Sequence, residues 1–143
     1  YNWDEHRDHF ILADCPDHDV DFGEGKKSIF ALEGTEILIQ RDKEVQMAAH
    51  EYGKGRGVYM AGFEYSPVNA RMLLNLLLWA KGLPLNSDWL TTDPETEAAW
   101  FPADKTLVVI NNSTQKKSTV VKTPDGDIAV ELDGLETKIL PQN

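Results

Sequence analysis

Cysteine is nearly absent from this sequence of 143 residues, with Cys15 as the single example. One cysteine excludes an intramolecular disulfide and a four-cysteine zinc site. A chain without disulfides fits a reducing compartment, so the sequence favours a cytoplasmic location. The sequence also lacks an initiating methionine and a clear opening helix or strand, as expected of a piece cut from a longer protein.

Long hydrophobic runs and an excess of positive charge are missing as well. The longest apolar run, "MLLNLLLWA" at 72–80, is about half of the roughly 20 residues that a membrane-spanning helix needs, so we expect no span and no signal peptide. The 24 acidic residues outnumber the 14 basic ones, giving a net charge of −10 at pH 7. Such a surface repels phosphate backbones and anionic lipids, so we expect no nucleic acid and no membrane as partner.

Residues 1–82 contain the predicted elements of an α/β domain. "HFILAD" at 9–14 predicts a short strand, and residues 33–35 predict a turn between two apolar runs. "EVQMAAHEY" at 44–52 and "GVYMAGF" at 57–63 flank a glycine-rich stretch. This arrangement predicts a β-hairpin.

A helix over residues 67–81 has the strongest local signals. Ser66 is a good N-cap, the proline after it is well tolerated at the first helical position, and Gly82 can take the left-handed conformation at the end. On a helical wheel the apolar residues leave only Arg71 and Asn75 as a narrow polar edge. We therefore expect this helix to be covered on more than one side.

The hydrophobic period changes from 3.6 to 2 in the second part of the chain. Residues 83–95 are rich in Pro, Asn, Ser, Thr and Asp and are interpreted as a linker. Residues 96–143 contain short β-branched runs with turn residues at 103–105, 111–113 and 125–126. The fold class is thus α/β plus all-β, with a small antiparallel β domain at the end.

The glycine-rich stretch is the first candidate site, because Gly53, Gly55 and Gly57 alternate with Lys54 and Arg56. A phosphate-binding loop would need its lysine followed by Ser or Thr and then a helix, and a dinucleotide fingerprint needs a different glycine spacing. The stretch is followed by a strand instead. A hairpin turn with positive-φ glycines and solvated basic side chains is the favoured interpretation.

Glu64 and Tyr65 are a second candidate, because they precede the predicted helix. In parallel α/β sheets, ligands bind at the carboxyl ends of strands beside helix N-termini, which makes both residues candidate ligand-binding residues. The alternative is that Glu64 stabilises the helix N-terminus by its charge and Tyr65 packs beside it.

The acidic segment near residues 4–21 raises the possibility of a metal site, since it also holds His6, His9 and His18. The glycine and glutamate positions of an EF-hand are not filled, and the histidines lack the spacing of a zinc site. A nucleophilic Cys15–His18 pair is disfavoured by the surrounding carboxylates. We expect a solvated acidic loop, with no metal and no cofactor.

Trp89, Trp100 and Phe101 are the last candidates. Together they could form a stacking platform for carbohydrate, with Trp100 as its central residue. Aromatic residues near a domain boundary also serve as core or interface fillers. Both alternatives stay open from the sequence.

Three stretches together resemble the C-terminal part of a known enzyme family: "ADCPDHDVDFGEGKKSIFAL", "VQMAAHEYGKGRGVYMAGFEYSPVNARMLLNLLLWA" and "LVVINNSTQKKSTVVKTPDGDIAVELDGLETKIL". The family is that of the β-1,3-galactosyl-N-acetylhexosamine phosphorylases, also called lacto-N-biose or galacto-N-biose phosphorylases, glycoside hydrolase family 112. The resemblance covers essentially the whole chain and is strongest over residues 45–79.

The resemblance implies a large cytoplasmic, homodimeric enzyme with an N-terminal (β/α)₈ barrel, a central amidotransferase-like (flavodoxin-like) α/β domain and a small C-terminal β domain. Residues 1–82 would then end the central domain. The family phosphorolyses β-1,3-galactosyl-N-acetylhexosamines to α-galactose 1-phosphate with inversion and without a metal. Inversion needs an acid on the leaving oxygen and attack from the opposite face. The resemblance places that acid and the substrate sites in the barrel, so no catalytic residue is assigned here.

Two functions of different classes follow. The chain is either a non-catalytic scaffold and assembly region of such a phosphorylase, or a carbohydrate-binding accessory module of a β-galactosidase-like glycoside hydrolase. Saturable sugar binding that depends on Trp100 would favour the second.

Overall fold

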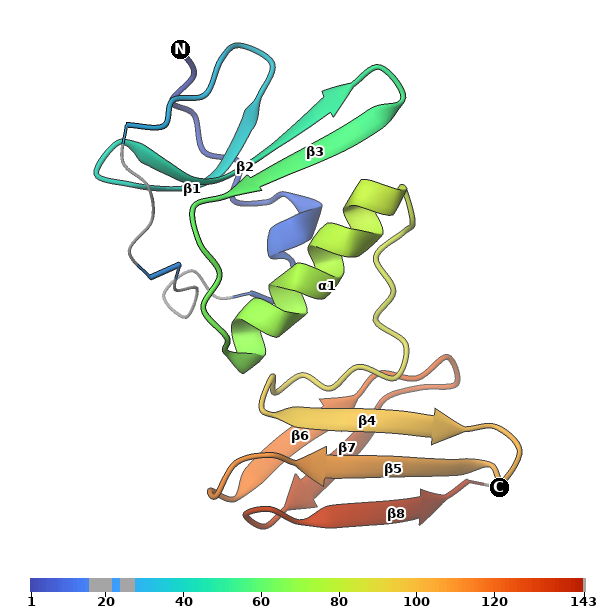
Figure 1. Ribbon diagram of the computed structural model, residues 1–143. Coiled ribbons are helices and arrows are strands. Elements are labelled where there is room, and N and C mark those ends of the chain that lie inside the picture. The colour runs from blue at the N-terminus through green and yellow to red at the C-terminus, as the bar shows by residue number, and fades with distance from the viewer. Residues whose placement is uncertain (16–21, 24–27, 143) are drawn as a thin grey trace. The chain divides into compact units, whose positions relative to one another are not determined.

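The structure, a computed structural model, describes residues 1–15, 22–23 and 28–142. The chain divides into two compact units, Tyr1–Leu85 and Asn86–Asn143. Three antiparallel sheets and one α-helix are the main regular elements of the described residues (Figure 1). No helix in the described ranges is long and apolar enough to cross a membrane.

The first unit consists of a three-stranded sheet and one long helix. The strands β1 (Glu36–Arg41), β2 (Glu44–Tyr52) and β3 (Gly55–Met60) form an antiparallel sheet in the order β1-β2-β3. The helix α1 (Pro67–Lys81) follows β3, and a short 3₁₀ helix, η1 (Phe10–Leu12), packs against it. Figure 1 shows η1 beside α1 and beneath the sheet.

The core of this unit lies between the sheet and the helix. Leu38 and Met47 from the sheet meet Met72 and Trp79 from α1, with Ile11 of η1 in the same cluster. Strand β2 is buried from Val45 to Ala49, so both of its faces are covered. A smaller apolar cluster covers its other face (Ala31, Ile37, Val45 and Ala48).

The prediction of a strand at 9–14 is wrong, because this segment forms η1. The His9 ring caps the short helix, with its Nδ1 accepting a hydrogen bond from the Ile11 N–H at 3.1 Å. Ile11 and Leu12 are adjacent and both buried, which a half-buried strand cannot achieve, since its side chains alternate between faces. The turn predicted at 33–35 is confirmed by a hydrogen bond from the Thr35 N–H to the Leu32 carbonyl.

The hairpin predicted around the glycine-rich stretch is confirmed. Tyr52 pairs with Gly55, which leaves a two-residue loop of Gly53 and Lys54. Gly53 has φ of 59°, and a positive φ at the first loop position is the requirement of a type II′ turn that glycine meets without strain. Gly55 and Gly57 lie within β3 and have no positive φ, so one glycine, not three, serves the turn.

Arg56 does not lie free at the hairpin tip, contrary to the sequence-based interpretation. Its Nη1 donates a hydrogen bond to the carbonyl of Trp79 at 2.8 Å, and its guanidinium lies 5.1 Å from the centre of the Trp79 ring. It also forms an ion pair with Glu51 at 2.8 Å. Arg56 therefore satisfies a carbonyl in the last turn of α1, where a positive charge is favourable.

The helix α1 has the predicted ends but a different environment. Ser66 Oγ accepts from the Asn69 N–H at 3.0 Å, and Gly82 takes a left-handed C-cap with φ of 73°. Asn75 is fully buried, not part of a solvated polar edge, because its amide donates to backbone carbonyls of the η1 segment. Leu74 and Leu77 are exposed instead, so among the described residues of the first unit the helix has an uncovered apolar face.

The second unit consists of two small antiparallel sheets. Its strands are β4 (Thr96–Phe101), β5 (Thr106–Asn111), β6 (Lys117–Val121), β7 (Ile128–Leu132) and β8 (Thr137–Pro141). One sheet has the order β4-β5-β8 and the other contains β6 and β7. The small antiparallel β domain that the sequence predicts is confirmed, including a turn after β4 at 102–105.

The core of the second unit lies between its two sheets. Leu107 and Val109 on β5 meet Val121 of β6 and Leu132 of β7, and all four are fully buried. Residues of the expected linker 83–95 take part in this unit: the Trp89 N–H donates to the Lys122 carbonyl at 2.7 Å, and the Lys122 N–H donates to the Leu90 carbonyl at 2.9 Å.

Gly134 has a packing role in this unit. A Cβ at this position would lie 2.2 Å from the Thr114 carbonyl oxygen, which is far inside contact distance. Glycine is therefore required for the β7–β8 turn to approach the loop between β5 and β6 this closely.

Candidate functional site

The loop between β3 and α1 places Glu64 and Tyr65 at the surface. Tyr65 is 81% exposed, and the backbone carbonyl of Glu64 accepts a hydrogen bond from the Asn69 side chain at 2.6 Å. The strands that lead to this loop are antiparallel, so the crevice typical of parallel sheets does not form from them. Ligand binding by Glu64 and Tyr65 stays a prediction.

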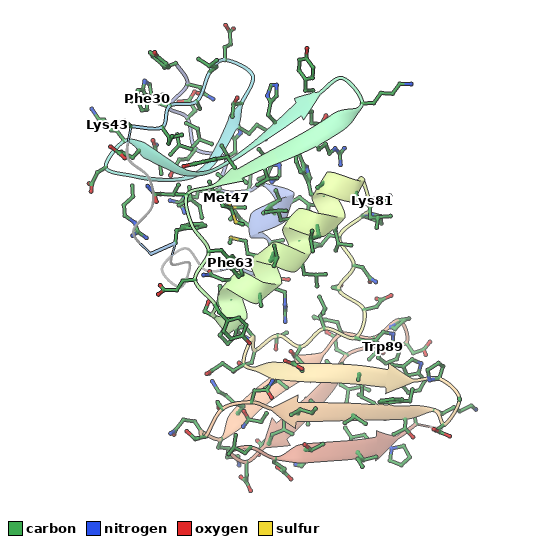
Figure 2. The ribbon with its side chains drawn as sticks, viewed as in Figure 1. Phe30, Lys43, Met47, Phe63, Lys81 and Trp89 are labelled. Carbon is green, nitrogen blue, oxygen red and sulfur yellow. The ribbon has the colours of Figure 1, made fainter. Side chains whose placement is uncertain are left out.

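A more complete site is present at one end of the second unit, where Trp89 and Trp100 stack on each other. Their ring centres lie 4.7 Å apart and their planes differ by 3°. Trp100 is on the inward-facing side of β4, together with Thr96 and Ala98, and both tryptophans pack against the core while staying partly exposed. Figure 2 shows Trp89 close to β4.

The backbone of Trp89 adopts an uncommon conformation to make this stack. Its φ is 63°, in the left-handed region that non-glycine residues seldom occupy. The Trp89 N–H is fixed on the Lys122 carbonyl, and Thr91 forms a β-bridge with Val121. Backbone pairing with Val121 and Lys122 therefore fixes the main chain on both sides of Leu90.

The tryptophan pair lines an open depression of about 750 Å³. Its wall comes from the β4–β5 turn, the β6–β7 turn and the segment after β8. These three meet because each antiparallel strand pair turns at the same end of the unit. The lining consists of Trp89, Trp100, Pro102, Lys105, Thr123, Asp125, Gly126, Asp127, Ile128 and Gln142.

The polar side chains of the depression carry both signs of charge. Lys122, on the adjoining end of β6, forms an ion pair with Asp127 at 2.6 Å. Thr123 Oγ1 donates to the Gly126 carbonyl at 2.6 Å and accepts from the Asp125 N–H at 3.3 Å, which fixes the β6–β7 turn. The depression thus combines an aromatic surface with carboxylate acceptors and an ammonium donor.

Phe101 does not belong to this arrangement. It follows Trp100 on β4, and successive side chains of a strand point to opposite faces. Phe101 is 50% exposed on the outer face of the β4-β5-β8 sheet, where Ile139 of β8 is 67% exposed. The three-residue aromatic platform considered from the sequence is therefore not assembled; Trp89 and Trp100 meet, and Phe101 lies apart from them.

Sequence reasoning missed the polar half of the depression. The sequence pattern identifies Lys105 and Asp125 only as turn residues and gives no role to Asp127. The available signal was topological: the two hairpin turns that carry them follow strands of similar length, and turns at one end of a small antiparallel unit come together.

Cys15 and the acidic segment do not form a reactive site in the described residues. Burial raises the pKa of the Cys15 thiol to about 11, so the thiolate that a nucleophile needs is disfavoured. His18 and the other residues at 16–21 lie outside the described residues. Within the described ranges, no group of three His, Cys, Asp or Glu side chains is placed to hold a metal ion.

Comparison with known proteins identifies the class to which these units belong. Residues 1–84 match the sequence profile of the lacto-N-biose phosphorylase central domain, and residues 89–140 match that of the lacto-N-biose phosphorylase C-terminal domain. The chain therefore belongs to the lacto-N-biose phosphorylase family, which confirms the resemblance found in the sequence.

The curated relatives are bacterial phosphorylases. The chain is 43% identical over 126 residues to a 1,3-beta-galactosyl-N-acetylhexosamine phosphorylase of Lachnoclostridium phytofermentans, covering 87% of this chain and 17% of the relative. It is 39% identical over 112 residues to the enzyme of that name from Bifidobacterium longum subsp. longum, covering 75% of this chain and 14% of the relative. A D-galactosyl-beta-1->4-L-rhamnose phosphorylase of L. phytofermentans is 32% identical over 137 residues, covering 92% of this chain and 19% of the relative. The chain thus spans less than a fifth of the length of these relatives.

Proposed function

We propose that this chain is the non-catalytic C-terminal scaffold and assembly region of a cytoplasmic, inverting phosphorylase. The longer enzyme would cleave β-1,3-galactosyl-N-acetylhexosamines with phosphate and release α-galactose 1-phosphate. The names of two relatives support this substrate class. In this proposal the (β/α)₈ barrel supplies the acid and binds both substrates.

The same proposal assigns the parts of the chain. Residues 1–82 would complete an amidotransferase-like (flavodoxin-like) α/β domain, residues 83–95 would connect the parts, and residues 96–143 would form the closing β domain. The match of both family profiles in this order supports that assignment. The antiparallel β1-β2-β3 sheet would then be an edge of the central domain.

The observation that carries the scaffold role is the apolar surface left uncovered in the first unit. Leu77 is 57% exposed and Leu74 is 38% exposed on the outer face of α1. Adjacent apolar side chains on one helix face mark a surface that is covered in an assembly. We assign this surface to contacts with the rest of the enzyme or with the second subunit of a homodimer.

Two measurements test the proposal. The full-length enzyme should release galactose 1-phosphate from galacto-N-biose and inorganic phosphate, whereas residues 1–143 alone should release none. Phosphorolysis by the chain alone, or its absence from the full-length enzyme, would contradict the assignment. A full-length enzyme that acts on galactosyl-rhamnose instead would revise the substrate class, in line with the third relative.

The scaffold role itself is tested with Leu77→Asp. In the chain alone the side chain is largely in water, so we expect a loss of only about 1 kcal/mol in unfolding free energy, from the lower helix propensity of Asp and its negative charge near the C-terminus of α1. In the full-length enzyme the same change places a charge in an interface, and we expect a clear loss of thermal stability or of the dimer. Equal effects in both proteins would refute the interface.

A further inference from the structure

The end of the second unit carries a feature that a scaffold does not require. A small sandwich could close its end with one aromatic side chain, yet here two tryptophans stack and line an open depression with charged groups around it. We propose that this depression binds a hexopyranose ring of a neutral carbohydrate. This inference goes beyond the proposed function and does not depend on it.

The arrangement of the tryptophan pair supports this proposal first. Trp89 has a φ of 63°, in the left-handed region that non-glycine residues seldom occupy. The Trp89 indole lies parallel to that of Trp100, with the ring centres 4.7 Å apart. Each indole covers one face of the other, and the ring surface that still lines the depression offers a flat contact to the C–H face of a sugar ring without ordering flexible side chains on binding.

The polar groups beside the two tryptophans also support a sugar as the ligand. Carboxylate oxygens are hydrogen-bond acceptors, so Asp125 and Asp127 can accept from a ligand that carries donors. Sugar hydroxyl groups are donors and acceptors at once, and they can also accept from the ammonium of Lys105. A proline-rich peptide, the other common ligand of aromatic-lined grooves, offers few donors and fits this lining less well.

The balance of charges around the depression also favours a neutral ligand. Asp125 and Asp127 are balanced by Lys105 and by Lys122, which pairs with Asp127. A balanced site in a chain of net charge −10 does not attract phosphate or other anions. A neutral sugar is the ligand that uses the aromatic surface and the mixed polar rim together.

The binding experiment uses the whole chain with galactose, N-acetylglucosamine and galacto-N-biose as probes, followed by tryptophan fluorescence and calorimetry. We expect saturable binding of at least one of them below about 10 mM, a range common for single-ring contacts on an open surface. Inorganic phosphate should neither bind nor compete. Absence of saturation for all three sugars, in a chain shown to be folded, would overturn the proposal.

The variants are chosen so that loss of folding does not mimic loss of binding. Asp125→Asn, at an exposed turn, should keep the fold and weaken binding about tenfold, because it removes a charged acceptor. Asp104→Asn is the matched control, since Asp104 is exposed in the neighbouring turn but does not line the depression. Trp89→Leu should abolish the fluorescence response and the binding. Equal binding by the Asp125 and Asp104 variants and by the unchanged chain would refute the site.

This experiment separates the inference from the proposed function. It measures sugar binding in a chain that is expected to lack phosphorolysis. Loss of the phosphorylase assignment would leave the binding result unchanged, and absence of binding would leave the scaffold role unchanged.

Discussion

In each of the two units a buried asparagine donates to backbone carbonyls, Asn75 in the first and Asn111 in the second, but the surroundings differ. In the first unit, Asn75 Nδ2 donates to the carbonyls of Ile11 at 3.3 Å and Ala13 at 2.8 Å. In the second, Asn111 Nδ2 donates to the carbonyls of Gln115 at 2.7 Å and Asp133 at 2.8 Å. Each amide satisfies carbonyls of an irregular segment that has no strand or helix partner for them.

The difference lies in how much apolar packing accompanies the asparagine. The first unit surrounds Asn75 with large side chains such as Met72 and Trp79. The second unit has a core of Leu and Val, together with buried threonines: Thr91 Oγ1 donates to the Thr96 carbonyl at 2.6 Å, and Thr96 Oγ1 donates to Thr119 Oγ1 at 3.1 Å. The stability of the smaller, second unit therefore depends more on its internal hydrogen bonds than that of the first.

The largest effect should come from Asn111→Ala. Asn111 Oδ1 also accepts from the backbone N–H and the hydroxyl of Ser113, so the change removes four part-buried hydrogen bonds at once. We expect a loss of about 3 kcal/mol in unfolding free energy, measured by urea denaturation. The neighbouring Asn112→Ala, at an exposed position, should cost less than about 0.5 kcal/mol. Similar losses for both variants would contradict the network.

A smaller loss, about 2 kcal/mol, is expected for Asn75→Ala. Two carbonyls of the η1 segment would lose their donor, while the apolar neighbours of the helix stay in place. Amide hydrogen exchange should show faster exchange at Leu12 and Ala13, whose N–H groups bond within this segment. Leu77→Ala on the exposed face is the control. A loss as large as that of Asn111→Ala would show that the two units do not differ in the way described.

The smallest effect concerns pH and the cap of η1. Burial lowers the pKa of His9 below its ordinary value of 6.5, and the Glu36 carboxylate at 3.9 Å offsets part of this shift. The unfolded chain therefore takes up a proton at a higher pH than the folded chain. The contribution of neutral His9 to the unfolding free energy should be fully present above pH 6.5. It should decrease as the pH falls from 6.5 toward the lowered pKa of His9.

His9→Asn tests this dependence, because asparagine keeps an N-cap acceptor but does not titrate. Unfolding free energies between pH 7.5 and pH 5, compared with those of the unchanged chain, should show a flatter profile for the variant in this window. A profile that is equally steep would assign the dependence to other groups.

Local signals were sufficient for much of this fold. The hairpin at 44–60 and the caps of α1 follow from glycine, serine and proline at positions whose backbone geometry they fit. Alternation was sufficient for the strands of the second unit. Such signals act between residues close in sequence, so they do not require knowledge of the tertiary structure.

The errors concern residues whose partners are distant in the sequence. The segment at 9–14 is short and apolar, and its conformation depends on packing against α1. Arg56 looked like a solvated hairpin residue, yet its partner Trp79 lies 23 residues away. The same limit applied to the candidate site, where Trp100 could be named but Lys105 and Asp125 could not.

The sequence by itself determined the family, the hairpin, the capped helix and the antiparallel strands, because each rests on local residue chemistry or on the order of residues along the chain. Only the tertiary structure decided that Asn75 is buried, that Arg56 bonds to the end of α1 and that Trp89 stacks on Trp100. These depend on which backbone groups and aromatic faces distant segments bring together, and no short stretch of residues contains that information.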